Sequence, residues 1–520
     1  MTSVKITIRP RRSMAVFAIL SIVMVVLSYV VLLTLAAGCV CLPYLALDSG
    51  HANFQVLALL LFGIAIAGAL LWSMVPRLDK FEAPGPLLER GAHPRLFAEL
   101  DDIANSLDEN LPHEVYLIGD MNAFVADRGG IMGFGSRRIM GLGLPLLALL
   151  NISEFRAVLA HEFAHYYGGD TRLGPWVYKT RMAIIRVFQS VGTLDALARL
   201  GILRIAYLFV TTLLKWYFKF FMTITNLISR RQEFRADELA CLVAGPQPLI
   251  AGLRTINGAG PAWPAYWQTE IAPLLESGTI PGLGDGFAQF VARPAIAVQV
   301  TAIMNSALLK PKSHPYDTHP PLRERIAAAE KLPALARTPE TQPASTLLEN
   351  PRETELNLVR TLFPVLSSDT LTFIPWDRVV NDVRLPNWKK AVATYANLLQ
   401  GITAESLPQT VAKLAELGAQ IRDPKGTLLM RGQRTERAAE LLAISFALAL
   451  LNHGWQMSAP PEVMDLQRGD ARLNPFVVVR EIMSGKTRAE DWVQRCRTLG
   501  ISEYSLAAQP PEALRAVSNT

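Results

Sequence analysis

The sequence predicts a mainly α-helical protein that is anchored in a membrane and contains a small β-sheet. Half of the 520 residues are hydrophobic and the mean hydropathy is positive, which is unusual for a soluble protein. Two stretches without charged residues, 14–42 and 56–75, account for much of this hydropathy. Much of the remaining chain shows helical periodicity that ends at glycine residues. Strand candidates are few and short.

Residues 1–80 are expected to form an N-terminal membrane anchor with two transmembrane helices. Each apolar stretch is as long as the roughly 20 residues that a helix needs to cross a bilayer, or longer. Basic residues precede the first stretch and follow the second, whereas the connection between them contains Asp48 and no lysine or arginine. The positive-inside rule therefore predicts that both flanks lie in the cytoplasm. The flanking basic residues are Lys5, Arg9, Arg11, Arg12, Arg77, Lys80, Arg90 and Arg95.

A predicted helix begins after residue 150. Asn151 and Glu154 form a capping-box pattern, in which each side chain bonds the backbone of the other residue at a helix start. Gly168 and Gly169 are expected to end the helix, because glycine tolerates the left-handed conformation that follows a helix end. The helix would therefore include the sequence AVLAHEFAH.

Two histidines of this helix point to a metal site. His161 and His165 lie one turn apart on the same face, so both imidazoles can reach one metal ion. Glu162 lies about 100° around the helix axis, where it can touch a water molecule near that ion without binding the ion. A buried histidine pair that bonds only backbone carbonyls is the alternative.

A second predicted helix, 229–245, offers a third ligand. Glu233 and Asp237 are four residues apart and share one face of it. A catalytic zinc ion takes three protein ligands and leaves a fourth position for water. We therefore predict a Zn²⁺ ion bound by His161, His165 and Glu233, with Asp237 accepting a hydrogen bond from a ligand imidazole. Without the histidine pair, this charged face would be interpreted as solvent-exposed.

Together these segments resemble the membrane zinc metallopeptidase family of the CAAX prenyl protease and HtpX. The resemblance extends over about 85–332 and rests on the sequences NISEFRAVLAHEFAH, EFRAD, EVYLIGDMNAFVAD, RRIMGLGLPLLALL and THPPLRERI. It implies a gluzincin-type metalloprotease domain at 81–332. It also implies a strand at 114–119 and an edge strand at about 137–142, which could bind an extended polypeptide through backbone hydrogen bonds.

The resemblance further suggests residues that contact the substrate. Peptide hydrolysis builds negative charge on a tetrahedral oxygen, which needs a donor besides the metal. His319 or Arg325 is the candidate for this catalytic role, and Asn122 is a candidate for lining the cleft. His314 is a weaker alternative to His319. The prolines beside His319 could instead simply begin a helix.

The segment 203–229 is expected to associate with the membrane. It is apolar but is interrupted by two lysines. Because His165 and Glu233 must lie on the same side of the membrane, the chain between them crosses it an even number of times. Two hypotheses remain: a pair of distorted spans, which the resemblance implies, or an amphipathic segment at the bilayer surface. Charged residues at 175–200 slightly favour the surface segment.

The remainder of the chain carries no recognisable chemistry. Residues 333–352 are rich in proline, alanine and threonine and are expected to form a linker. Residues 353–520 are expected to form an α-helical region of unknown role. His453 stands alone and is expected to be structural. The four cysteines show no metal-binding spacing. Four tryptophans are expected in the core: Trp376, Trp388, Trp455 and Trp492.

We therefore predict a membrane-bound zinc-dependent endopeptidase in which Glu162 acts as general base and then protonates the leaving amine. Its partners would be the lipid bilayer and polypeptides, chiefly misfolded or membrane proteins, and no basic–aromatic pattern indicates nucleic acid. Two clear spans instead of many favour HtpX-like quality control over prenyl-protein processing. Such an enzyme would be a multi-pass protein of the bacterial inner membrane with its active site facing the cytoplasm.

A membrane-anchored scaffold or binding protein with a structural or silent metal site is the main alternative. Glu162 argues against it, because a structural zinc ion needs no general base. A transporter is less favoured still, because the sequence contains too few convincing spans.

Overall fold

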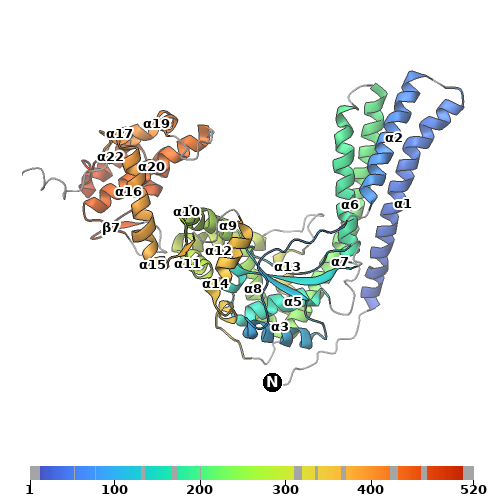
Figure 1. Ribbon diagram of the computed structural model, residues 1–520, viewed down its shortest axis with the longest axis horizontal. Helices are drawn as coiled ribbons and strands as arrows, with labels where there is room; N and C mark the ends of the chain where they lie inside the picture. Colours follow the sequence, from blue (N-terminus) through green and yellow to red (C-terminus); the bar gives the residue numbers. More distant parts are fainter. Residues whose placement is uncertain are drawn as a thin grey trace, which may run out of the picture. The chain divides into compact units, whose positions relative to one another are not determined.

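The computed structural model describes residues 12–51, 53–75, 78–130, 135–166, 174–198, 201–309, 319–333, 338–364, 371–421, 431–457 and 465–507 (Figure 1). Helices predominate and the sheets are small, which confirms the predicted class. The chain divides into two compact units. The first comprises Met1–Trp263 and Val298–Leu366, and the second comprises Pro264–Ala297 and Ser367–Thr520.

Four helices of the first unit lie side by side (Figure 1). They are α1 (Arg12–Asp48), α2 (Phe54–Met74), α6 (Gly174–Gly192) and α7 (Gly201–Ala244). Among the described helices, α2, α7 and the part Ile19–Asp48 of α1 are each long and apolar enough to cross a membrane. The helices α1 and α2 pack so closely that a Cβ at Gly63 would lie 1.9 Å from the carbonyl oxygen of Cys39. Only glycine fits there.

The helix α7 is continuous, so the predicted segment 203–229 and the predicted helix 229–245 are parts of one rod. It packs beside α6 and the two N-terminal helices. Two charged residues of α6 find polar partners within this bundle. Arg181 donates to the side chain of Asn226 at 2.9 Å, and Arg186 donates to the carbonyl of Ser73 at 3.3 Å.

A three-stranded sheet stands beside the helices of the first unit. Its strands are β1 (Glu114–Ile118), β2 (Ala123–Arg128) and β3 (Arg137–Gly143), in the order β1-β3-β2. The strand β3 runs parallel to β1 and antiparallel to β2. The strand at 137–142, expected at the edge, is therefore central. Its run of apolar and glycine residues is buried from Ile139 to Gly143, as suits a strand with neighbours on both sides.

The edge of the sheet is β2, because the other outer strand is covered. The amide of Leu88 donates to Val115 at 2.7 Å, and the amide of Leu117 donates to Pro86 at 3.0 Å. Across β3, a Cβ at Gly141 would lie 2.4 Å from the ring of Phe124, so glycine is required where β2 and β3 pair.

The helix α5 (Ile152–Ala164) lies at the centre of this unit, and its predicted capping box is confirmed. Asn151 accepts from the amide of Glu154 at 2.9 Å, and Glu154 accepts from the amide of Asn151 at 3.1 Å. The helix ends at Ala164, and Gly168 and Gly169 lie outside the described residues. The other helical elements described between residues 94 and 362, outside the second unit's own helices, are α3 (Pro94–Ser106), α4 (Leu144–Leu149), η2 (Thr193–Ala196), α8 (Pro246–Ala259), α12 (Pro294–Leu309), α13 (Leu322–Ala329), η4 (Ala344–Leu347) and α14 (Pro351–Leu362).

The predicted linker 333–352 is not a loose connection where the structure describes it. The amide of Ile152 donates to Gln342 at 2.9 Å and that of Ser153 donates to Glu340 at 3.2 Å, so this segment runs along the start of α5. Arg156 of α5 is buried and bonds Glu340 at 2.7 Å. Apart from the short helix η4, the described part of this segment is irregular, and an irregular segment can still pack tightly through its backbone.

The second unit is mostly helical and includes residues 264–297, which were expected to belong to the metalloprotease domain. The strand β4 (Thr279–Ile280) pairs with β5 (Thr372–Phe373), and Glu270 forms ion pairs with Arg293 and Arg384. Residues 264–297 therefore fold with the C-terminal region. The other elements are α9 (Ala262–Tyr266) at the boundary, η3 (Trp267–Ile271), α10 (Ala272–Glu276), α11 (Leu283–Ala292), α15 (Trp376–Val379), η5 (Val380–Arg384), α16 (Leu385–Thr394), α17 (Ala396–Leu399), α18 (Leu407–Ala412), α19 (Leu414–Gln420), α20 (Arg431–Asn452), β6 (Gln456–Met457), β7 (Leu466–Arg468), β8 (Ala471–Leu473), α21 (Pro475–Met483) and α22 (Ala489–Leu499).

The isolated histidine and the tryptophans of this unit have structural roles, as predicted. His453 stacks on Tyr504 with 3.7 Å between ring centroids and bonds the carbonyl of Ala449. Trp388, Trp455 and Trp492 are buried, and Trp376 donates to the carbonyl of Gly282 at 2.7 Å. All four cysteines are unbridged.

Replacing Asn151 by alanine removes the side chain that accepts from the amide of Glu154. We expect a loss of about 1 kcal/mol of stability, which would lower the midpoint of thermal unfolding of the detergent-solubilised protein. Asn151→Asp keeps an acceptor at this position and should unfold close to the unmodified protein. Equal midpoints for Asn151→Ala and the unmodified protein would contradict this role of the cap.

Candidate metal centre

The crossing of α5 and α7 forms the candidate site. His161 lies in the last turn of α5, and His165 caps that helix with a backbone still in the right-handed helical region, at φ −62° and ψ −17°. Both imidazoles therefore stay on the same face. The helix α7 presents Glu233 to them, and the small residues Ala236 and Ala240 are buried one and two turns along from it. Small side chains at these positions permit the close approach of the two helices.

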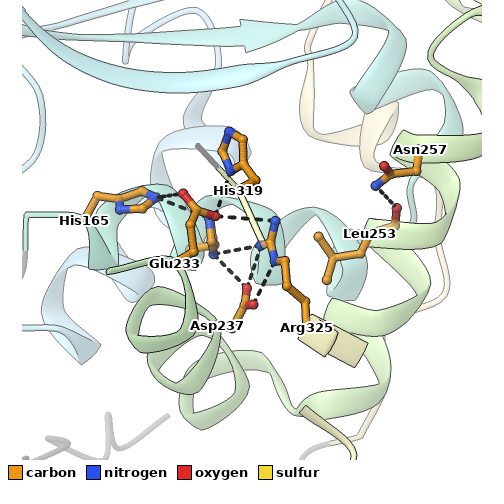
Figure 2. Close-up of polar contacts among 8 residues, drawn as sticks. His165, Glu233, Asp237, Leu253, Asn257, His319 and Arg325 are labelled. Carbon is orange, nitrogen blue, oxygen red and sulfur yellow. Dashed lines mark hydrogen bonds and ion pairs between the residues drawn. The ribbon is translucent and has the colours of Figure 1, made fainter. Parts of the chain in front are cut away.

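Candidate ligand atoms of three residues face one another at this crossing. The Nε2 atoms of His161 and His165 are 3.2 Å apart. The two carboxylate oxygens of Glu233 lie 3.5 Å from these nitrogens, Oε2 from His161 and Oε1 from His165. Figure 2 shows the carboxylate of Glu233 between the imidazole of His165 and the guanidinium of Arg325.

One ligand atom from each of the three residues lies within 4.8 Å of the others, so a single metal ion can reach all three. The 3.2 Å between the two imidazole nitrogens is close to the roughly 3.3–3.6 Å that separates neighbouring ligands of a tetrahedral zinc ion. Oε2 of Glu233 is also buried and, among the described residues, makes no hydrogen bond of regular geometry. Two imidazoles and a carboxylate suit zinc but do not by themselves exclude other divalent transition metals.

A second layer of side chains orients the ligands. Asp237 lies 3.0 Å from Nδ1 of His161, which leaves Nε2 of that ring for a metal. Arg325 is buried and donates to both carboxylate oxygens of Asp237, at 2.8 and 2.7 Å. Its Nη1 lies 3.4 Å from Oε2 of Glu233 (Figure 2). Arg325 is thus held behind the ligands.

Burial and the neighbouring charges shift the protonation of the three residues on α5. Burial alone would lower the pKa of His161, but hydrogen bonds to Asp237 and Glu233 raise it to about 9. Burial, followed by the charge on His161, lowers the pKa of His165 to about 4. Burial raises the pKa of Glu162 to about 7. The site therefore holds one positive charge on a ligand imidazole when it holds no cation, and a bound cation would displace that proton.

His319 lies at the open side of the cluster. Its Nδ1 is 3.0 Å from Oε2 of Glu233, and 64% of its side chain is exposed. Figure 2 places it across Glu233 from Asp237. Asn122 is exposed just before β2, and within the described residues no hydrogen bond or ion pair joins its side chain to the cluster. His314 lies outside the described residues.

Tyr166 is a residue that the sequence analysis missed. It directly follows His165, and its hydroxyl donates to the carbonyl of Val125 in β2 at 2.9 Å. The guanidinium of Arg138 lies 4.3 Å from the centre of its ring. Tyr166 therefore fixes the end of the histidine helix against the edge strand. Its position directly after His165 could have suggested a role at the site, but the sequence does not show that β2 is its partner.

Comparisons with known proteins agree with this arrangement. Residues 92–333 match the family model described as Peptidase family M48. "Protease HtpX" of Xylella fastidiosa (strain 9a5c) is 28% identical over 194 residues, which cover 35% of this chain and 63% of the relative. "Protease HtpX homolog" of Leuconostoc citreum (strain KM20) is 26% identical over 253 residues, covering 46% of this chain and 73% of the relative.

The first relatives are matched over less than two thirds of their own length. "Protease HtpX homolog" of Desulfotalea psychrophila is 32% identical over 156 residues, or 28% of this chain and 51% of the relative. No solved structure gives a significant match. The family model covers both metal-site helices and the sheet, and together with the relatives named HtpX it supports the assignment of residues 92–333 to peptidase family M48.

Proposed function

We propose that this protein is a membrane-bound zinc-dependent endopeptidase of the gluzincin type that degrades misfolded or membrane-associated proteins. One observation carries the proposal. His161, His165 and Glu233 lie close enough together for one metal ion to reach all three, and Glu162 follows His161 on the same helix with a pKa raised by burial to about 7. A structural metal site would not need a half-buried carboxylate beside its ligands.

The residues around the metal divide the chemical work between them. A zinc ion held by the three ligands would polarise the scissile carbonyl and lower the pKa of a water molecule. Glu162 accepts the proton of the attacking water and passes it to the leaving amine.

His319 is the better candidate for stabilising negative charge on the reacting carbonyl oxygen. It lies at the open side of the cluster, next to Glu233, and most of its side chain is exposed. Arg325, the other candidate from the sequence, is buried and occupied by Asp237. We therefore assign Arg325 the role of positioning Asp237 and Glu233. The observations give Asn122 no comparable support as a cleft residue.

Substrate capture is proposed at β2, which replaces the two strands expected from the sequence. Among the described residues, β2 pairs with β3 alone, which leaves its outer edge for an extended polypeptide. Tyr166 connects this edge to His165 through the carbonyl of Val125. Recognition by backbone hydrogen bonds reads little side-chain identity, which suits a protease of unfolded segments.

The membrane arrangement supports an active site in the cytoplasm of a bacterial inner-membrane protein. If α1, α2, α6 and α7 all cross the bilayer, His165 and Glu233 fall on the same side of it, as one shared metal ion demands. Basic residues flanking α1 and α2 place that side in the cytoplasm by the positive-inside rule. The relatives named as HtpX proteases support a protease activity.

Replacing Glu162 by glutamine tests the enzyme against the scaffold. The amide cannot accept the proton of water, so casein cleavage should fall by about 10²-fold or more while the bound zinc is retained. Cleavage is measured by peptide release and zinc by elemental analysis of the same purified samples. Equal cleavage by both proteins would remove Glu162 from the mechanism. Equal zinc with no cleavage by either protein would support the scaffold.

Two further substitutions separate a ligand from the residue that orients a ligand. Glu233→Ala removes one of the three metal-binding groups and should leave the protein largely free of zinc after dialysis. Asp237→Asn keeps all three groups, and we expect it to weaken zinc binding by about 10–100-fold. Competition with a fluorescent chelator measures both. Full zinc occupancy in Glu233→Ala would exclude Glu233 from the ligand set.

A further inference from the structure

The hydroxyl of Tyr166 bonds the strand at which the proposed function places the substrate. It donates to the carbonyl of Val125 in β2 at 2.9 Å. Tyr166 directly follows the candidate ligand His165, and its own amide donates to the carbonyl of Phe163 in the last turn of α5 at 2.9 Å. The contact therefore joins the end of the histidine helix to a backbone group of β2.

The carbonyl of Val125 faces the outer edge of the sheet. In β3, the carbonyl of Arg138 accepts from the amide of His113, which leads into β1, so Arg138 turns its backbone groups toward β1. Met140 lies two residues further along β3 and turns the same way. Val125 is the partner of Met140 in the antiparallel pair. Because Met140 faces β1, the amide and carbonyl of Val125 point away from β3.

The same alternation gives β2 three residues with outward backbone groups: Ala123, Val125 and Asp127. Among the described residues, the hydroxyl of Tyr166 is the only hydrogen-bond partner of these outward groups. An extended polypeptide that pairs with β2 would bond the same groups. Tyr166 therefore already holds one of the positions that a substrate would need.

A substrate strand and the hydroxyl of Tyr166 compete for this position. Neighbouring strands lie about 4.7–4.9 Å apart, which brings the amide nitrogen of an added strand to about 2.9 Å from the carbonyl that it bonds. The hydroxyl oxygen of Tyr166 lies at that distance from the carbonyl oxygen of Val125. One donor must leave before the other can bind in its place.

Arg138 holds the ring of Tyr166 beside the strand. Its guanidinium lies 4.3 Å from the ring centre. It also forms ion pairs with Glu109 at 3.4 Å and with Asp127 of β2 at 4.0 Å. These contacts involve the ring and not the hydroxyl, so the hydroxyl can be removed by substitution while the ring keeps its neighbour.

We propose that Tyr166 occupies the substrate's hydrogen-bonding position on β2 in the free protein and releases it when an extended polypeptide pairs with this strand. The inference rests on the proposed function and identifies a residue that controls access to its substrate edge. The contact also covers part of an exposed strand edge, which would otherwise be available for pairing with other chains.

Tyr166→Phe tests the proposal because it removes only the hydroxyl. Tyr116→Phe is the matched control: Tyr116 lies in β1, which β3 separates from β2, and its hydroxyl donates to Glu114 at 2.8 Å. Each substitution is combined with Glu162→Gln in the full-length protein, so that a polypeptide can bind without being cleaved. Binding of fluorescein-labelled casein is measured by fluorescence anisotropy.

We expect Tyr166→Phe to lower the Kd for casein by about 2–10-fold, because the substrate amide no longer has to displace a hydroxyl. Tyr116→Phe should leave the Kd unchanged. An unchanged or higher Kd for Tyr166→Phe would overturn the proposal, and so would an equal fall in both variants. A residue that only stabilised the fold would not tighten binding when its hydrogen bond is lost.

The kinetics of casein cleavage with Glu162 intact give a second readout. Tyr166→Phe should lower KM by about the same factor and change kcat much less, because the lost bond exists only in the free protein. A fall in kcat with an unchanged KM would contradict the proposal. Absence of cleavage by the unmodified protein, together with the expected change in Kd, would count against the proposed function and not against the release of the strand edge.

The environment of the hydroxyl can also be followed directly. In Glu162→Gln, 3-fluorotyrosine incorporated at Tyr166 should change its fluorine NMR resonance when casein is added. The same label at Tyr116 should keep its resonance. An unchanged resonance at Tyr166 with casein bound would show that the hydroxyl stays on Val125, and the proposal would fail.

Discussion

The structure of the first unit depends on a buried carboxylate that faces two imidazoles. Glu233 contributes negative charge to an interior that also contains Asp237, and the positive charges of Arg325 and His161 balance it. Such a cluster is costly to bury unless its members are held in fixed positions. Small residues where α5 and α7 cross hold these side chains close together. The capping box and the segment around Glu340 hold the start of α5 in place.

The helix α7 connects this cluster to the candidate membrane helices. Because α7 runs without a break from the bundle to Glu233, one rigid element supplies both a candidate span and a metal ligand. At the other side of the site, Tyr166 connects the histidine helix to the edge strand β2. A substrate bound at this strand would contact an element that also positions His165. This geometry supports proteolysis close to the membrane surface.

Local sequence patterns predicted the local structure well. The spacing of His161 and His165, and of Glu233 and Asp237, determines which residues share a helix face, and the capping box determines where α5 begins. The sequence did not reveal which strands and segments far apart in the chain would pair. The central place of β3 depends on partners 9 to 25 residues away in sequence, and composition cannot reveal that an irregular segment near 340 packs on α5. The position of Arg325 against Asp237 could not be predicted, because Asp237 lies 88 residues earlier in the chain.

X-ray absorption at the zinc edge of the purified full-length protein tests the central claim most directly. The account predicts a single zinc ion with four nitrogen or oxygen ligands at about 2.0–2.2 Å and scattering from two imidazoles. A sulfur ligand at about 2.3 Å, a third imidazole, or a protein that takes up no zinc would contradict it.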